Sequence, residues 1–171
     1  MRTRCWTALA LTLLVASPAS ADRWTAIEQL PGAPTVRLLV RSKERIYFRV
    51  TAEKPLAFPV VGPAQVRLTT RVEMPAGSPA IATYQVKVSE GPRVVSQIST
   101  ESSPADSVSL PGSAVRFGKS RTLTFDVPAG KHSLSLALAG TGAALARVQK
   151  SGGGGDLAMV SLTPTSAARS V

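Results

Sequence analysis

Basic side chains that alternate with apolar ones are the residues of this sequence best suited to binding chemistry. They fall in three segments and comprise Arg45, Tyr47, Arg49, Arg67, Arg71, Gln85 and Lys87. Because alternate side chains of a strand point to the same side, each segment would present these residues on one face. Guanidinium groups bind carboxylate, sulfate and phosphate oxygens, and a tyrosine ring can stack on a sugar. If the three strands are neighbours, they predict a basic platform for an anionic glycan or a lipid head group.

A second interpretation of the same residues needs no ligand. Long basic side chains can coat the solvent face of a sheet and cover its apolar surface with their stems. Trp24 presents a similar choice, because it can pack against an apolar strand or a sheet edge, or stack on a ligand. Both interpretations stay open at the level of the sequence.

Patterns that support catalysis or metal binding do not occur in this sequence. His132 is the single histidine and Cys5 the single cysteine, which excludes multi-histidine and cysteine metal sites. The run from Gly112 to Ser120 has one residue too many between its glycines for a phosphate-binding loop, and the acidic residues show no pairing of the kind that glycosidases need. We therefore predict no catalytic residue, no cofactor and no metal, and we expect His132 to face solvent or to bond within a hairpin. A polysaccharide-acting hydrolase is the least favoured alternative.

The elements that must position the basic residues are strands, because apolar and polar residues alternate with a period of two along nearly the whole chain. The strands expected are 24–28, 36–40, 44–51, 66–71, 84–89, 93–99, 120–127, 132–138, 144–149 and 157–162. On the best of them, Phe48, Phe125 and Leu136 lie on the apolar side. The pattern predicts an all-β protein of about nine or ten strands, each with one wet face.

Glycine and proline pairs separate these runs. Val127-Pro128-Ala129-Gly130 predicts a hairpin turn that joins 120–127 to 132–138. Pro55, Pro59 and Pro63 crowd one segment, and proline is confined to sheet edges and corners, which a closed barrel lacks. We therefore expect an antiparallel β-sandwich, of jelly-roll or immunoglobulin-like type, with a ten-stranded barrel as the alternative.

The N-terminal segment predicts an exported protein. Residues 1–21 have the basic start, the short apolar run and the Ala19-Ser20-Ala21 ending of a secretory signal peptide, with cleavage expected between Ala21 and Asp22. The β-sandwich domain is then expected over 22–163, followed by a frayed tail over 164–171, with no transmembrane segment after cleavage. The chain contains no asparagine and hence no glycosylation sequon, which favours a bacterial address, periplasmic or secreted.

Charge narrows the class of partner. The whole chain carries a formal net charge of +10, and loss of Arg2 and Arg4 with the signal peptide leaves +8. Such a charge favours polyanions in general, and export argues against nucleic acid among them. Solubility is the simpler explanation of the same charge.

A short stretch carries a family resemblance. The ten residues from Phe125 to Leu134, with the sequence FDVPAGKHSL, resemble a hairpin of secreted carbohydrate-binding jelly-roll modules. This resemblance implies a β-sandwich that binds carbohydrate, and it transfers no binding residue. Gly62-Pro63 with the VRL run that follows resembles secreted bacterial proteins of unassigned activity. The sequence thus predicts an exported, non-catalytic binding or envelope-associated module; the alternative is a structural or protein-interaction domain that pairs exposed strand edges, such as Leu157–Leu162, with another envelope protein.

Overall fold

The computed structural model describes residues 24–140 and 142–151, and the regular elements within these ranges are ten strands. They are β1 (Thr25–Ile27), β2 (Thr35–Val40), β3 (Lys43–Thr51), β4 (Leu56–Met74), β5 (Ala82–Glu90), β6 (Arg93–Ser102), β7 (Val108–Ser109), β8 (Arg116–Phe117), β9 (Arg121–Ala139) and β10 (Ala143–Ser151). The all-β prediction is confirmed. Among the described residues no helix has the length and hydropathy needed to cross a membrane. The predicted signal peptide, the predicted strand 157–162 and the predicted tail lie outside the described ranges.

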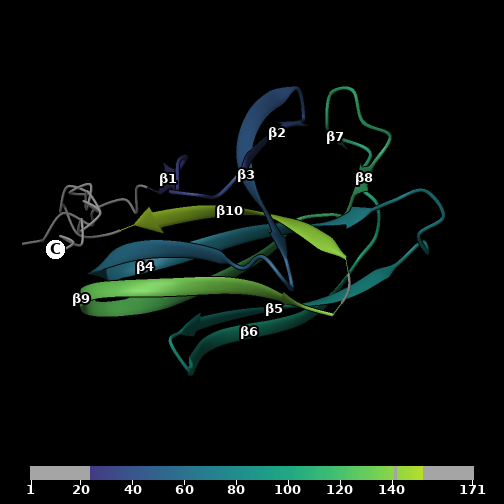
Figure 1. Cartoon of the computed structure of the whole chain (residues 1–171). Helices are drawn as coiled ribbons and strands as arrows, with labels where there is room; N and C mark the ends of the chain where they lie inside the picture. The colour runs from purple at the N-terminus through teal and green to yellow at the C-terminus, as the bar shows by residue number, and fades with distance from the viewer. Residues whose placement is uncertain (1–23, 141, 152–171) are drawn as a thin grey trace, which may run out of the picture.

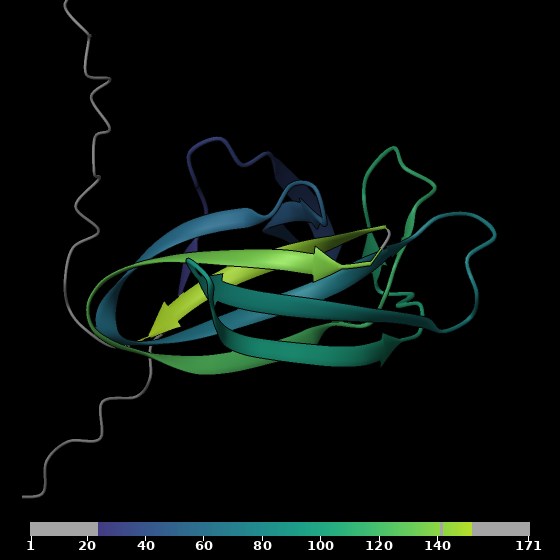
Figure 2. The ribbon, with the colours of Figure 1, turned by 60° about the horizontal axis from the view of Figure 1, so that its bottom comes forward.

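The strands form one antiparallel sheet that folds over into two packed layers. The order is β6-β5-β9-β4-β10-β3-β2-β7, with β1 attached to β10 and β8 to β4. β4 and β9 are 19 residues each and run side by side around one end of the molecule, from one layer to the other (Figure 1 and Figure 2). The first layer holds β6, β5 and one half of each long strand; the second holds the other halves with β10, β3 and β2. This arrangement confirms the predicted β-sandwich.

The corner between the layers overturns one prediction. Pro128-Ala129-Gly130 lies inside the continuous strand β9 and does not close a hairpin. Gly130 instead pairs with Gly62 of β4, and the register shifts between Gly62 and Ala64. A Cβ atom added to Gly62 would collide with the carbonyl group of Pro128, so only glycine lets the two strands approach this closely. The two strands therefore bend together, as strands that switch between sheets do.

His132 holds this corner in place. Its Nδ1 lies 2.8 Å from Oε1 of Glu90 at the end of β5, and its Nε2 lies 3.1 Å from the carbonyl oxygen of Pro128. The histidine thus bonds the bend of β9 to the neighbouring strand. It has the bonding role that the sequence suggested, at a corner and not at a hairpin.

Two prolines of β4, Pro59 and Pro63, lie at positions where a sheet tolerates proline. Pro59 pairs with Ser133 of β9, and β10 joins β4 from Gln65 onward. Within residues 24–140 and 142–151, the first half of β4 is therefore an edge of its layer. Proline has no N–H to donate to a neighbouring strand. At an edge, one side of the strand has no neighbour, so the missing N–H costs no hydrogen bond of the sheet. Pro63 lies at the corner itself.

The inner core fills the space between the layers. Phe48 and Val50 of β3, Phe58 of β4, and Leu134 and Leu136 of β9 are all at most 2% exposed within it. Phe125 packs against this core from its margin and is partly buried. The predicted apolar side of these strands is confirmed, because the residues come from both layers and face one another.

A second, smaller apolar cluster lies on the opposite face of the β2-β3-β10 part of the sheet. It consists of Leu38, Tyr47, Val108, Phe117 and Leu145, each at most 8% exposed. The segment 103–118, which contains β7 and β8, folds across this face, with a backbone bond from Ala105 to Phe117. The expectation of one wet face per strand is therefore wrong for this part of the sheet.

Candidate functional site: a basic hollow beside the outer cluster

The structure brings together five of the seven predicted site residues. β10 lies between β3 and β4, and its Leu145 is in register with Arg49 on one side and Arg71 on the other. Arg45, Tyr47, Arg49, Arg67 and Arg71 therefore point to the same, outer face of the second layer. Gln85 and Lys87 belong to β5, in the first layer, and alternate with its buried residues. They lie on the opposite side of the sandwich and take no part in this face.

Tyr47 and Arg71 are not the solvent-facing residues that the sequence predicted. Tyr47 is 3% exposed and Arg71 is 7% exposed. The segment 103–118 covers both, and the tyrosine ring packs in the outer cluster. Tyr47 consequently has no free ring face to offer a sugar, which removes the aromatic stacking part of the predicted platform.

Arg49 and Arg67 each have a partner within the protein. Arg49 forms an ion pair with Glu73 at 2.7 Å, with the arginine side chain 55% exposed. The guanidinium carbon of Arg67 lies 3.7 Å from the centre of the Trp24 ring, a cation–π stack. Trp24 thus packs against a strand of the sheet, the first of the two alternatives that the sequence left open.

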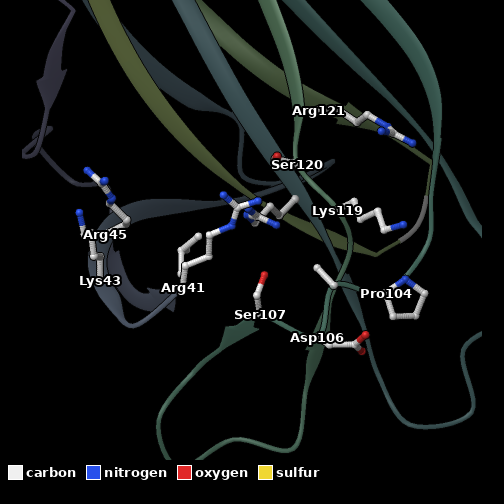
Figure 3. A pocket seen from close by; sticks show the side chains of 12 residues that line it. Arg41, Lys43, Arg45, Pro104, Asp106, Ser107, Lys119, Ser120 and Arg121 are labelled. Carbon is white, nitrogen blue, oxygen red and sulfur yellow. The ribbon is translucent and has the colours of Figure 1, made fainter.

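A hollow of about 980 Å³ opens beside the outer cluster, where the sequence did not place a site. Its lining comprises Val40, Arg41, Lys43, Arg45, Arg71, Pro104, Ala105, Asp106, Ser107, Lys119, Ser120 and Arg121. Six of these side chains are cationic and one is anionic, which gives the lining a formal charge of 6 − 1 = +5. Figure 3 shows Lys43 and Arg45 on one side, Lys119 and Arg121 on the other, and Arg41 extending between them.

The β2-β3 turn and the connection between β8 and β9 bring these cations together. The two-residue turn between β2 and β3 places Arg41 and Ser42 at φ of 49° and 63°, and the Arg41 N–H donates to the Ser107 carbonyl at 2.9 Å. On the opposite side the Lys119 N–H donates to the Ser103 carbonyl at 2.8 Å. Sequence reasoning followed alternation within strands, and it missed residues at strand ends and in connections. The missed cations are Arg41, Lys43, Lys119 and Arg121.

Arg71 lines the hollow from beneath. Its Nη1 donates to the Gly118 carbonyl at 3.0 Å and its Nε to the Tyr47 hydroxyl at 3.5 Å. The ion pairs among the described residues join Arg37 to Glu44, Arg49 to Glu73 and His132 to Glu90, and none of them includes Arg71. A buried guanidinium without a carboxylate is costly, because arginine cannot shed its charge.

Burial and nearby positive charges act in opposite directions on the pKa of Tyr84. Burial raises the pKa of the Tyr84 phenol, and its hydrogen bond to Thr70 and the charges of Arg121 and Arg71 act in the opposite direction. Tyr84 belongs to the inner core, and its burial there is the largest of these causes, so the net direction is upward.

The chemistry that this lining supports is the binding of an anion. Six cationic side chains and two serine hydroxyls line one space. Arg71 is held there by its bonds to Gly118 and Tyr47, whereas the guanidinium of Arg121 donates to the Glu101 carbonyl. Among the described residues no three histidine, cysteine or acidic side chains gather as metal ligands would.

Comparisons with known proteins find a likeness among solved structures. No protein-family model matches the chain, and a search of the curated proteins returns no relative. A solved structure of a carbohydrate-binding module from Cellvibrio mixtus lichenase 5A, in complex with cellotriose, aligns with 73% of this chain and 90% of its own. The sequence identity is 13% and the TM-score 0.36. A likeness at this level transfers neither a fold nor a ligand, so the fold above rests on strand pairing and the site on its residues.

Proposed function

We propose that this protein is an exported, non-catalytic module that binds an anionic polysaccharide through the basic hollow. The segregation of charge carries the proposal. The described ranges contain sixteen lysines and arginines and eight acidic residues, and the hollow takes six of the former and one of the latter. Charge that served solubility alone would be spread over the surface with both signs interspersed.

The shape of the site favours a polysaccharide over a membrane surface. The cations line a concavity, and Arg71 at its base is 7% exposed. A substituent that projects from a sugar chain can enter such a hollow. A bilayer presents its head groups as a plane, and proteins that bind it also insert apolar side chains, whereas the apolar lining residues here are Val40, Pro104 and Ala105.

The test compares dextran sulfate with neutral dextran by titration calorimetry at about 20 mM and about 500 mM salt. We expect dextran sulfate alone to bind, with affinity falling steeply as salt screens the charges. The variant Arg41→Gln/Lys43→Gln/Arg45→Gln should lose at least about tenfold in affinity, because each lost charge in a shared site weakens attraction. The control Lys87→Gln/Arg93→Gln/Lys131→Gln removes the same charge elsewhere and should lose less than about twofold.

Three results would overturn the proposal. One is the absence of dextran sulfate binding at the lower salt. Another is an equal loss in both triple variants, which would reduce the interaction to net charge. The third is tighter binding to phosphatidylglycerol vesicles than to dextran sulfate, which would make the partner a membrane.

A second candidate function, pairing with another protein, rests on the edge strand β6. Among the residues that the structure describes, this strand pairs only with β5, and its Val94 is 49% exposed. Between Arg93 and Glu101 it carries no charge to deter a partner strand. The β5-β6 register shifts between Val88 and Ser89, where Val95 of β6 is left as the extra residue of a bulge, and a bulge is one way that proteins protect an edge. Binding through this edge would be insensitive to salt, which separates it from the first proposal.

A further inference from the structure

We propose that the hollow holds one tetrahedral oxyanion, a phosphate or sulfate group, on the guanidinium of Arg71. This inference rests on the proposed function and deepens it, since it names the substituent that the polysaccharide would present. The argument starts from the donors that Arg71 keeps free.

Arg71 uses only part of its hydrogen-bonding capacity within the protein. A guanidinium carries five N–H donors and no acceptor. Nε and Nη1 each make one bond, to Tyr47 and Gly118, and Nη2 makes none to any of the described residues. The donors that remain belong to a side chain that lines the hollow. An anion in the hollow would satisfy them and neutralise the buried charge at the same time.

The guanidinium is held in place before any ligand arrives. The Gly118 N–H donates to the Val72 carbonyl at 2.9 Å, and the Gly118 carbonyl accepts from Arg71. A Cβ atom at position 118 would collide with Ser102 and Val72, so the backbone here is packed tightly against β4 and the end of β6. Binding at Arg71 therefore requires little loss of side-chain freedom, which favours affinity.

The arrangement of donors suits a tetrahedral anion better than a carboxylate. One guanidinium fork satisfies both oxygens of a carboxylate. Here further donors border the same space from different segments, with Arg41 in the β2-β3 turn, Ser107 just before β7 and Ser120 just before β9 (Figure 3). The ammonium of Lys119 adds charge at the rim and extends away from Arg41 (Figure 3). Phosphate and sulfate carry oxygens in several directions. The carboxylate of Asp106 points away from Arg41 and leaves the centre basic (Figure 3).

The experiment uses sodium sulfate, sodium phosphate and sodium acetate as probes, with sodium chloride at matched ionic strength as the reference. Thermal unfolding reports stabilisation, because a ligand that binds only the folded state raises its stability with concentration. Nitrogen-15 spectra of the arginine side chains report the site, since Arg71 Nε should shift on binding. We expect saturable stabilisation by sulfate and phosphate with one site per chain, and at most a tenth of that affinity for acetate.

Two variants and a control locate the effect. Arg71→Lys keeps the charge but loses the fork, and it should weaken sulfate binding at least about tenfold. Arg41→Gln changes an exposed turn residue and should weaken it about threefold or more, which keeps the test valid if Arg71→Lys fails to fold. Lys87→Gln, on the far side of the sandwich, should leave sulfate binding unchanged.

Each contrary outcome has a distinct meaning. If dextran sulfate binds but neither small oxyanion gives a saturable effect, the oxyanion site is overturned and the proposed function stands. If acetate equals sulfate, or if Arg71→Lys and Arg41→Gln both bind sulfate like the wild type, the site is likewise overturned. If dextran sulfate itself does not bind, both proposals fall together.

Discussion

The two apolar clusters of this protein lie on opposite faces of the same strands and are built differently. The inner core lies between two layers of sheet and draws on both. The outer cluster has a sheet on one side only, and a segment with two short strands, β7 and β8, covers it. Tyr47 and Phe48 are adjacent in β3, yet one faces the outer cluster and the other the inner core.

The comparison shows that a covering segment can turn a solvent face into an interior without a second sheet. It also shows what such a cover leaves behind. Polar groups of the former solvent face, Tyr47 and Arg71, become buried with partial bonding, while the uncovered margin becomes a basic hollow. The inner core contributes to the stability of the fold. The outer cluster contributes to stability as well, and it also borders the binding site that we propose.

The largest effect should come from the inner core. Phe58 is 1% exposed between the layers, so Phe58→Ala should lower the free energy of unfolding by about 3–5 kcal/mol, through lost burial and a cavity. Urea unfolding followed by circular dichroism measures this. Phe125→Ala, at the margin of the same core, is the control and should cost less; an equal cost would mean that the two layers do not enclose Phe58.

Truncation in the outer cluster should cost somewhat less and should also reach the site. Leu145→Ala is expected to lower the free energy of unfolding by about 2–4 kcal/mol, and to weaken sulfate binding, because Leu145 is in register with Arg71. Leu136→Ala makes the same change in the inner core and should leave sulfate affinity intact. Equal sulfate affinity in the two variants would contradict the coupling of the outer cluster to the hollow.

A smaller effect on stability is expected from the hydrogen bond between Tyr47 of the outer cluster and the buried Arg71. Tyr47→Phe removes the hydroxyl that accepts from Arg71 Nε and should cost about 0.5–1 kcal/mol of unfolding free energy, in line with a long hydrogen bond. The same variant should shift the Arg71 Nε resonance. An unchanged resonance would show that the two side chains do not meet.

The smallest effect concerns the turn that positions Arg41. Ser42 has φ of 63°, a conformation that glycine adopts without steric cost. Ser42→Gly should therefore raise the free energy of unfolding by up to about 1 kcal/mol, and Ser42→Ala should lower it. Thermal unfolding of both variants decides the matter, and stabilisation by alanine would contradict the left-handed turn.

Much of the fold follows from local sequence rules. Alternation located eight of the ten strands, and the buried side of β3 and β9 follows from Phe48 and Leu136. The strand character of 56–64 escaped prediction because its prolines argue against a ladder, and the corner at Pro128 escaped because the same residues also suit a hairpin. The close approach of Gly62 to Pro128 shows that this segment is a corner and not a hairpin. This contact joins segments far apart in the chain, so local sequence rules do not reveal it.

The sequence predicted the chemistry of the site, the binding of an anion by basic side chains, and did not predict its position in the fold. The basic strand residues pointed to anions, and Arg45 and Arg71 do line the hollow. The burial of Tyr47 and Arg71 depends on the path of 103–118, which has no periodic pattern to fix it. The missed cations, among them Arg41 and Lys119, border one hollow because the β2-β3 turn and the connection between β8 and β9 both bond to the segment 103–107.

The central claim is that anions bind at the hollow and nowhere else on the sandwich. A titration of uniformly nitrogen-15-labelled protein with a short dextran sulfate oligomer, followed by backbone and arginine side-chain spectra, tests it most directly. We predict shifts confined to residues 40–45, 71, 104–107 and 118–121, with Arg71 Nε among the most perturbed. Shifts that spread evenly over exposed cations, including Lys87 and Arg93, or that leave Arg71 unchanged, would contradict the claim.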